Sequence, residues 1–567
     1  MARKNFTSNL PFIIILGLFI HEQCAFGFTK NGTTYTTDGS MQDVSDAIGD
    51  ANIGDLITMP AGTFIWGDAG AYLSIFKSVK IQGAGIDQTI INISPTASTW
   101  TSGVIRMFLD GDESFGGVTI NGPAGSNYHS PFSIHAYLSP GIWRISNVKY
   151  IQQSGDDGYF VFVHQSNSGL IDNCDVTGGA GSAELIMMRG EPDSWDTDNS
   201  LGEEGNVFIE NCTFRGQGYV CDANSNSRMV VRYCTITDNM KIDGHGVWSN
   251  SNPTRGVRHM EIYGNHWTST AGAWTAMEIR GGSGMIFNNV SDLGSGINGA
   301  WFYLTEYGVF NNNGVFGQYQ TPANYPIRDQ IGRGKYSSPG DYTTATSEPM
   351  YVWNNLKGGV QWPFTNNAIP MAAITLYGST FDWEDIIKAD RDYFLSTSSF
   401  NGTTGIGSGT AAQMQLITPT KNGVGFWVTD EGEWNSQNAG SDGQLYTWNV
   451  NQWMLKYTPY CYPHPLVSGN GCTNIPLGIA KNSSSSDIKV YPIPNNGNFM
   501  LDLSSLQSET VYMNIVNILG EIVHTEIISV PAGKTNVPIS LGQNAKGVYN
   551  IQIFSKKRTV NQRFIVN

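Results

Sequence analysis

The sequence predicts an all-β protein built around a parallel β-helix. Two observations carry this prediction: a composition rich in turn-forming residues, and a short β-prone segment that recurs along the chain. The 567 residues include 66 glycines, and only 14% are charged, whereas soluble domains carry about a quarter charged residues. The hydrophobic fraction of 40% is too high for a disordered chain.

The recurring segment is a short β-prone run that ends in Asn or Cys. Its six copies end at Cys174, Cys212, Cys234, Asn265, Asn289 and Asn355, so successive copies lie 38, 22, 31, 24 and 66 residues apart. Such a period with variable insertions is typical of parallel β-helix coils, which bury a common core by stacking about 4.8 Å apart. We expect each terminal Asn or Cys to point inward and stack on its counterpart, with the three cysteines as free thiols. Helical periodicity is confined to a short segment near residues 41–50.

The N-terminus predicts export. Basic residues at positions 3 and 4, an apolar run over 11–20 and a small-x-small site at 25–27 indicate a signal peptide covering residues 1–27. The apolar run is too short to span a bilayer, which needs about 20 residues, so no transmembrane segment is expected. The sequence leaves open whether Cys461 and Cys472 form a disulfide.

Residues 28–360 resemble the pectate-lyase-like right-handed parallel β-helix proteins. The residues that carry the resemblance are Gly54-Asp-Leu-Ile-Thr-Met-Pro-Ala-Gly-Thr63 and Val79-Lys-Ile-Gln-Gly-Ala-Gly85, which are similar to the first coils of that superfamily. The resemblance implies a right-handed parallel β-helix, but this fold hosts lyases, hydrolases, epimerases and non-enzymes. We expect residues 361–480 to form the last coils and a C-terminal cover.

After a polar linker at 481–487, residues 488–567 are expected to form a small C-terminal β-sandwich. They resemble the C-terminal sorting domain of the type IX secretion system of Bacteroidetes. The carrying motifs are Tyr491-Pro-Ile-Pro494, Gly497-Asn-Phe499, Leu519-Gly-Glu-Ile522, Gly547-Val-Tyr549 and Phe564-Ile-Val-Asn567, with Ile493 where the common form has Asn. The resemblance implies the type IX machinery as a partner, with release outside the cell or attachment to its surface.

A row of polar residues outside the repeat predicts where the active site lies. Strands expected at 159–167, 183–191, 218–226, 244–250, 275–282 and 300–306 precede the repeats and form their own sheet. Aligning their C-terminal ends places polar side chains on one row about 4.8 Å apart, which suits an extended glycan chain. The row comprises His164, Arg189, Asp222, Ser249, Arg280 and Glu306.

Positively charged residues concentrate in the same coils. The net charge of −15 disfavours nucleic-acid binding, yet arginines concentrate between 228 and 335, and guanidinium groups bind carboxylates well. We therefore expect a secreted polysaccharide lyase that cleaves an anionic, uronic-acid-containing chain by β-elimination. His245 is the candidate base, Arg255 and Arg280 neutralise the carboxylate, and Tyr303 is the candidate acid. The candidate substrate-binding residues are His164, Arg189, Asp222, Asn224, Arg228, Lys241, Arg328 and Arg333.

Alternatives stay open at this point. A glycoside hydrolase on the same fold would use a carboxyl pair such as Asp157 with Asp222, and a non-catalytic surface glycan-binding protein or adhesin needs neither. An epimerase shares the proton abstraction. Arg280 has a structural alternative, an ion pair with Glu261 or Glu278. Ca²⁺ is a candidate cofactor, with an acidic loop at 191–204 as one source of ligands, but no metal ligands are assigned.

Overall fold

The structure is a computed structural model, and it forms two compact units, residues 1–473 and 474–567. It describes residues 27–97, 103–108, 112–123, 130–135, 141–153, 158–179, 184–191, 194–245, 255–268, 276–292, 330–337, 344–362, 374–376, 379–381, 387–397, 399–437, 442–468, 488–492, 495–505, 509–517, 522–531, 533–541, 546–554 and 559–566. The predicted signal peptide and linker, together with Cys472, Tyr303, Arg328, Asp157, Ser249 and Glu306, lie outside the described residues. No helix in the described part is long and apolar enough to cross a membrane.

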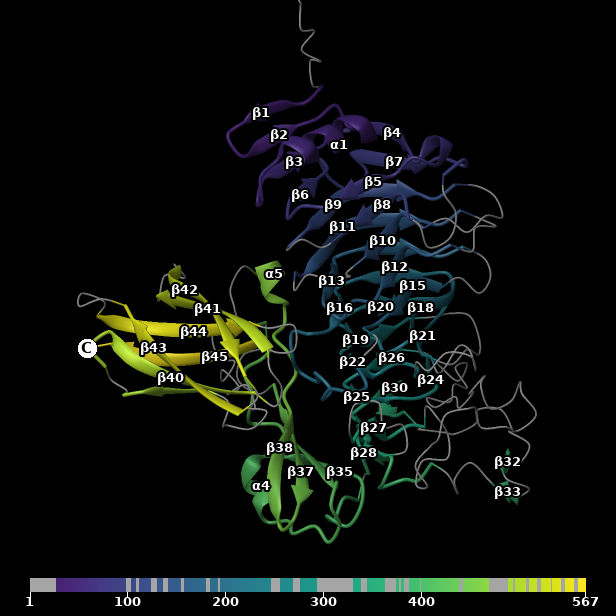
Figure 1. Ribbon diagram of the computed structural model, residues 1–567. Coiled ribbons are helices and arrows are strands. Elements are labelled where there is room, and N and C mark those ends of the chain that lie inside the picture. Colours follow the sequence, from purple (N-terminus) through teal and green to yellow (C-terminus); the bar gives the residue numbers. More distant parts are fainter. Residues whose placement is uncertain are drawn as a thin grey trace, which may run out of the picture. The chain divides into compact units, whose positions relative to one another are not determined.

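The first unit is a stack of β-coils (Figure 1). Its 22-stranded first sheet contains two parallel ladders that share β9 and β11. One ladder runs through β2 (Thr34–Thr36), β3 (Leu56–Thr58), β6 (Lys80–Gln82), β9 (Ser114–Asn121), β11 (Trp143–Ile151), β13 (Gly169–Asp172), β16 (Val207–Glu210), β19 (Arg228–Arg232), β22 (His259–Tyr263), β25 (Ser283–Phe287), β29 (Met350–Trp353) and β34 (Tyr393–Leu395). The other includes β4 (Gly62–Trp66), β7 (Thr89–Ile93), β14 (Asp175–Thr177), β17 (Thr213–Arg215), β20 (Thr235–Ile236), β23 (His266–Trp267), β26 (Val290–Ser291) and β30 (Leu356–Lys357).

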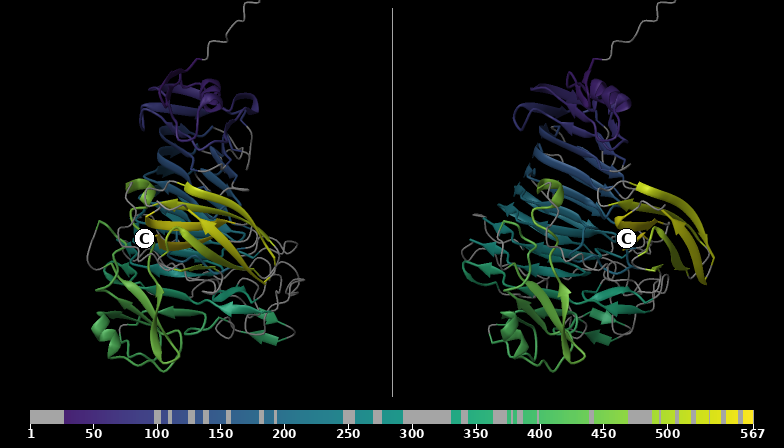
Figure 2. Two further views of the ribbon diagram at one scale, coloured as in Figure 1. Left: turned by 60° about the vertical axis from the view of Figure 1, so that its left-hand side comes forward. Right: turned by 90° about the vertical axis from the view of Figure 1, so that its left-hand side faces the viewer.

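The second sheet has eight parallel strands on another side of the coils (Figures 1 and 2). In order they are β5 (Leu73–Ile75), β8 (Ile105–Met107), β10 (Phe132–His135), β12 (Val161–His164), β15 (Glu184–Arg189), β18 (Gln217–Asn224), β21 (Asn239–Gly244) and β24 (Met277–Ile279). The parallel stacking confirms the predicted β-helix. Of the strand predicted at 244–250, Gly244 is the last residue of β21, which begins at Asn239 and pairs with β18, and residues 246–250 lie outside the described residues.

An apolar ladder runs through the interior and explains why the coils stack. One inward position per coil is paired in register from strand to strand, and all of its side chains are buried. The position is filled by Ile57, Ile81, Phe115, Ile145, Ile171, Ile209, Val231, Ile262, Ile286 and Val352. β-Branched side chains fit this pleated, buried environment.

The predicted Asn and Cys ladder forms a second interior stack. The amide of Asn265 donates to Asn289 Oδ1 at 3.0 Å, and that of Asn289 donates to Asn355 Oδ1 at 2.8 Å. The backbone N–H of Cys174 contacts Cys212 Sγ at 3.4 Å, and Cys174, Cys212 and Cys234 are free and buried. This prediction is confirmed.

The residue before each Asn or Cys of this interior stack adopts a left-handed backbone conformation. This conformation turns the chain from one strand ladder of the first sheet to the other. At four of the six coils this residue is Asn and at one it is Gly, the types that tolerate positive φ best; Tyr233 is the exception. The φ angles are 53° at Asn173, 55° at Asn211, 53° at Tyr233, 67° at Gly264, 54° at Asn288 and 49° at Asn354.

Both ends of the stack carry additional elements. At the N-terminal end lie β1 (Thr29–Asn31) and α1 (Met41–Asp50), where Ser40 caps the helix by accepting from the N–H of Asp43. The helix was predicted, and its apolar face is buried against the core. Towards the C-terminal end come β27 (Arg333–Tyr336), β28 (Ala345–Ser347), β31 (Val360–Gln361), β32 (Ile374–Leu376), β33 (Ser379–Phe381), β35 (Ile406–Gly409), α4 (Ala411–Gln415), β36 (Gly425–Val428), β37 (Gln444–Asn449) and β38 (Gln452–Tyr457). The short helix α5 (Pro465–Ser468) lies instead beside the middle of the stack, where it contacts β11.

Residues 457–468, which we call the strap, lie against the outer side of the first sheet. The strap crosses successive coils: Tyr457 donates to Glu261 at 2.5 Å, the carbonyl of Tyr460 accepts from Arg232 at 2.7 Å, and the carbonyl of Leu466 accepts from Arg144 at 2.6 Å. Cys461 in the strap is disulfide-bonded, and its predicted partner Cys472 lies outside the described residues.

The second unit is a small β-sandwich. One sheet contains β39 (Ile488–Tyr491), β40 (Asn498–Ser505) and β43 (Gly533–Ser540), and the other contains β42 (Ile522–Val530), β41 (Glu509–Asn517), β44 (Gly547–Phe554) and β45 (Thr559–Val566). Apolar residues of both sheets form one core, including Leu501 and Ile551. The fold class predicted for this segment is confirmed.

Candidate active site

Alternate residues of the second sheet point outward in two rows. Their neighbours in sequence, such as Val163, Met188 and Ala223, belong to the buried core, so the intervening side chains face away from it. The strand register aligns the first row as Ser133, Phe162, Met187, Asp222, Asp243 and Glu278. The second row, two residues further along each strand, contains His135, His164, Arg189, Asn224, His245 and Arg280.

The register corrects the row expected from the sequence. Arg189 pairs with Asn224, whereas Asp222 pairs with Met187 and belongs to the first row. The expected alignment therefore misplaced Asp222 by two residues along its strand, and Asn224 holds the position assigned to it. His164, Arg189 and Arg280 lie on the second row as expected, and His245 occupies the position assigned to Ser249.

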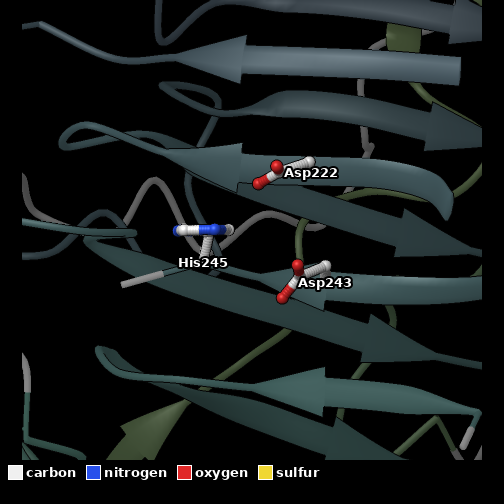
Figure 3. Close-up of side chains that lie close together, drawn as sticks. All are labelled: Asp222, Asp243 and His245. Carbon is white, nitrogen blue, oxygen red and sulfur yellow. The ribbon is translucent and has the colours of Figure 1, made fainter. Parts of the chain in front are cut away.

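Three groups meet at the centre of the two rows. Asp222, Asp243 and His245 each offer a ligand or proton-transfer atom within 4.8 Å of the others, and all three are buried. Figure 3 shows the two carboxylates on adjacent strands with the imidazole beside them. One oxygen of each carboxylate, Oδ1, has no hydrogen-bond partner. We call these residues, together with Glu184, Tyr219, Lys241, Glu278 and Arg280, the central cluster.

Two cations pair with carboxylates of the central cluster. Arg280 Nη2 lies 2.6 Å from Glu278 Oε2 and 3.0 Å from Asp243 Oδ2. Lys241 pairs with Glu278 and lies 4.1 Å from the ring centroid of Tyr219. Of the two structural alternatives for Arg280, the structure therefore shows the pair with Glu278; Glu261 instead binds the strap.

Burial and crowding change the acidity of these groups. Burial and the neighbouring Asp222 raise the pKa of Glu184 to about 8, and burial raises the pKa of Asp222 to about 7 although Arg280 opposes it. Burial also raises the pKa of Asp243, and Asp222 adds to the rise. Burial alone would raise the pKa of Glu278, but Lys241 and Arg280 lower it. The central cluster therefore holds protons on carboxyl groups near neutral pH.

The donor set does not fit Ca²⁺ well. Calcium takes six to eight oxygen ligands, whereas Asp222, Asp243 and His245 offer two carboxylates and an imidazole, and Arg280 already lies against Asp243. Two carboxylates with one imidazole resemble the ligand sets of smaller transition-metal ions. We assign no chemical step to a metal.

The other predicted residues have structural partners. The guanidinium of Arg255 is buried, stacks 3.3 Å from the ring centroid of Trp195, and donates to the carbonyls of Arg333 and Gly334 at 2.9 and 2.7 Å. Arg228 donates to Ser200 and Thr197 at 3.0 and 2.8 Å.

These contacts hold the buried Arg255 and the half-buried Arg228 against the segments at 194–200 and 333–334. Arg333 itself is buried beneath Tyr336. We therefore do not carry Arg255, Arg228 or Arg333 forward as groups that touch substrate.

The sequence did not identify Glu184 and Tyr219, or give Asp243 and Glu278 a role. A signal exists for the last two: three successive coils carry an acidic residue two positions before a polar one, as Asp222-Ala-Asn224, Asp243-Gly-His245 and Glu278-Ile-Arg280. The spacing of two puts both members on one face of a strand.

The fold and the site define a parallel β-helix protein with a buried cluster of acids and bases on its second sheet. Residues 489–567 match the family of secretion system C-terminal sorting domains. No curated protein matches the chain significantly.

Two solved structures show distant likeness. Tailspike protein 4 of bacteriophage CBA120 has 9% identity and a TM-score of 0.33, covering 95% of this chain and 67% of its own. The A-module of mannuronan C-5 epimerase from Azotobacter vinelandii has 15% identity and a TM-score of 0.20, covering 50% of this chain and 98% of its own. Likeness at these scores carries no argument about activity.

Proposed function

We propose that the protein is an exported polysaccharide lyase that cleaves an anionic, uronic-acid-containing chain by β-elimination. The observation that carries the proposal is the contact between acids and bases in the central cluster, on a row of side chains that continues through Asn224, Arg189 and His164. Donors spaced by one strand interval, about 4.8 Å, suit a chain of uronate residues lying along the coil axis.

In this proposal His245 takes the proton from C5 of the uronate. The electron pair forms a double bond between C4 and C5, and the bond from C4 to the leaving oxygen breaks. Arg280 and Lys241 supply positive charge near the substrate carboxylate, which makes the C5 proton more acidic. The proton for the leaving oxygen comes from the pair Asp222 and Asp243, which holds a proton near neutral pH. Tyr303, the acid expected from the sequence, stays a prediction.

The carboxyl pair also supports hydrolysis as a second candidate. Retaining glycosidases place two carboxyl groups about 5–5.5 Å apart, one of them protonated. Asp222 and Asp243 approach this arrangement, with atoms within 4.8 Å and raised pKa values. The pair expected from the sequence, Asp157 and Asp222, stays a prediction, because Asp157 lies outside the described residues.

Export is part of the proposal. The match to sorting domains over residues 489–567 supports secretion and a location outside the cell or at its surface. We propose the type IX machinery of Bacteroidetes as the partner of this domain, as the motifs from Tyr491 onward imply.

The test incubates the purified protein with a panel of anionic polysaccharides, with and without EDTA. β-Elimination predicts a rise in ultraviolet absorbance from the new double bond, with one new reducing end per double bond. His245→Gln should abolish the rise while leaving the unfolding midpoint near that of the wild type. His266→Gln is a matched control, because His266 is partly exposed and pairs with Asp292 on the first sheet.

Each other outcome of this test would indicate a different activity. New reducing ends without absorbance would replace elimination with hydrolysis. Inverted C5 stereochemistry without cleavage would indicate an epimerase, and binding without any turnover would indicate a surface glycan-binding protein. Full activity of His245→Gln would remove that residue from the mechanism.

A further inference from the structure

The second row continues beyond the central cluster towards the N-terminal coils, and there it becomes aromatic. Ile75 pairs with Met107, and Met107 pairs with Ile134, which places Phe76, Phe108 and His135 at equivalent positions, one residue further along β5, β8 and β10. His135 pairs in turn with His164.

Three rings in this part of the row, those of Phe108, His135 and His164, stack on one another. Phe108 and His135 have centroids 5.0 Å apart with planes 14° apart, and His135 and His164 have centroids 4.5 Å apart with planes 10° apart. Arg189 follows with its guanidinium carbon 5.2 Å from the ring centroid of Phe162. The parallel stacking therefore directs the edges of these three rings outward from the sheet.

The side chains at the N-terminal end of the second row are more exposed than those of the central cluster. His245 and Arg280 are buried, whereas Phe108 is 36% and Phe76 46% exposed. Tyr72, 47% exposed, lies beside them with Arg106 packed 3.4 Å from its ring centroid. Exposed apolar rings that join a buried polar cluster in one line are characteristic of a ligand-binding surface rather than of scattered surface residues.

The charge of this region fits an anion. Between β5 and β15 the two outward rows contain Ser74, Phe76, Arg106, Phe108, Ser133, His135, Phe162, His164, Met187 and Arg189, and none of these is acidic. The chain as a whole carries a net charge of −15. The two outward rows of these five strands therefore carry only basic charged side chains, a local reversal of sign; the one acidic residue of β15, Glu184, lies before the rows and belongs to the central cluster.

We propose that Phe76, Phe108, His135, His164 and Arg189 form a binding track for further residues of the same polyuronate chain whose scissile bond lies at the central cluster. This inference rests on the proposed function. The ring edges contact the C–H groups of the sugars, and the imidazole and guanidinium groups contact their carboxylates. From β18 to β5 there are five strand intervals, about 24 Å, so the track accepts roughly five residues beyond the cleaved bond.

The consequence is that affinity depends on chain length. Short oligouronates that reach only the central cluster gain nothing from the track, whereas longer chains gain contact with each further strand. The protein should therefore prefer polymer over short oligosaccharides, with the preference residing in KM rather than in kcat.

The experiment compares kcat/KM for an oligouronate series with that for the polymer, in the full-length protein and in Phe76→Ala/Phe108→Ala. The ratio of kcat/KM for long chains to that for short ones should fall about tenfold, through KM, in this variant. Leu416→Ala is the control, because Leu416 is 86% exposed after α4 and lies off the second sheet. An unchanged ratio in the aromatic variant, with the unfolding midpoint intact, would overturn the track.

A binding measurement separates this result from the proposed function. Electrophoretic retardation in gels that contain the polysaccharide needs no turnover. Retardation that weakens in Phe76→Ala/Phe108→Ala supports the track even if the products show hydrolysis instead of elimination. Turnover on polymer with wild-type retardation in the variant refutes the track and leaves the proposed function standing.

Discussion

Replacing Arg232 with Met should detach the strap and strongly destabilise the first unit. Arg232 and Glu210 have no exposed side-chain area. The guanidinium donates to Glu210 Oε2 at 2.8 and 2.6 Å, to the carbonyl of Tyr460 at 2.7 Å and to that of Cys461 at 2.6 Å. Met fills a similar volume but supplies none of these bonds.

The size of the loss in unfolding free energy follows from the Glu210 carboxylate, which Arg232→Met leaves without its cation. Without Arg232, Glu210 keeps the N–H of His464 at 3.0 Å, and a buried carboxylate without its cation costs about 3–5 kcal/mol. Removing both charges in Glu210→Gln/Arg232→Met avoids the unpaired charge, so the double variant should be more stable than Arg232→Met alone.

The assay is denaturant unfolding followed by tryptophan fluorescence, with limited proteolysis to report strap release. Arg215→Met is the matched control: Arg215 pairs with Asp175 on the same sheet, but both side chains are about 40% exposed, and such pairs contribute about 0–1 kcal/mol. Equal losses for Arg232→Met and Arg215→Met would refute the claim that the buried pair holds the strap.

Three further predictions concern other parts of the chain. Because the pKa of Asp222 is raised to about 7, the folded state holds a proton that the unfolded state releases above about pH 4. The free energy of unfolding should therefore fall as the pH rises from about 4 to 7. Asp222→Asn should flatten that slope in unfolding curves measured across this range. Asn289→Ala breaks the interior Asn and Cys ladder and should cost about 1–3 kcal/mol of unfolding free energy, whereas the same change at Asn31, which is exposed at the end of β1, should cost much less. Deleting residues 487–567 should leave turnover of the purified protein intact and stop export, and loss of turnover would contradict that division of roles.

The β-helix could be predicted because its signal is local and repeated. Each coil must fill the same interior positions, so the Asn and Cys at the repeat ends reveal the period directly. The left-handed turn before each ladder position favours Asn or Gly and strengthens the pattern. The second sheet was harder to align, since β21 and β18 contain fewer repeated residue types and nothing in the sequence fixes the strand ends.

The site could be predicted only in part. Asp222, Lys241, His245 and Arg280 were singled out, and the structure places them together. The role expected for Arg255 stays a prediction, since sequence cannot distinguish a guanidinium that faces substrate from one that binds main-chain carbonyls beside a tryptophan, and the structure shows the second kind of contact. Both uses concentrate arginine in the same coils, and only the fold separates them.

The charges of the central cluster constrain how it works. Four carboxyl groups, Glu184, Asp222, Asp243 and Glu278, face two permanent cations, so a fully ionised cluster would repel an anionic chain. Two carboxylates whose oxygens lie within 4.8 Å of each other repel by about 3 kcal/mol or more at an effective dielectric constant of 20, which agrees with the raised pKa values of Asp222 and Glu184.

Protons on these carboxyl groups therefore serve two purposes in the proposed mechanism: they lower the negative charge that the substrate meets, and they supply the acid for the leaving oxygen. Both are lost as Asp222 and Glu184 ionise near pH 7 and 8. We expect kcat/KM on the polymer to decline above about pH 7–8, through a rise in KM as well as a fall in kcat. A pH profile that stays flat to higher pH would show that the carboxyl protons take no part, and would leave His245 and Arg280 to act without them.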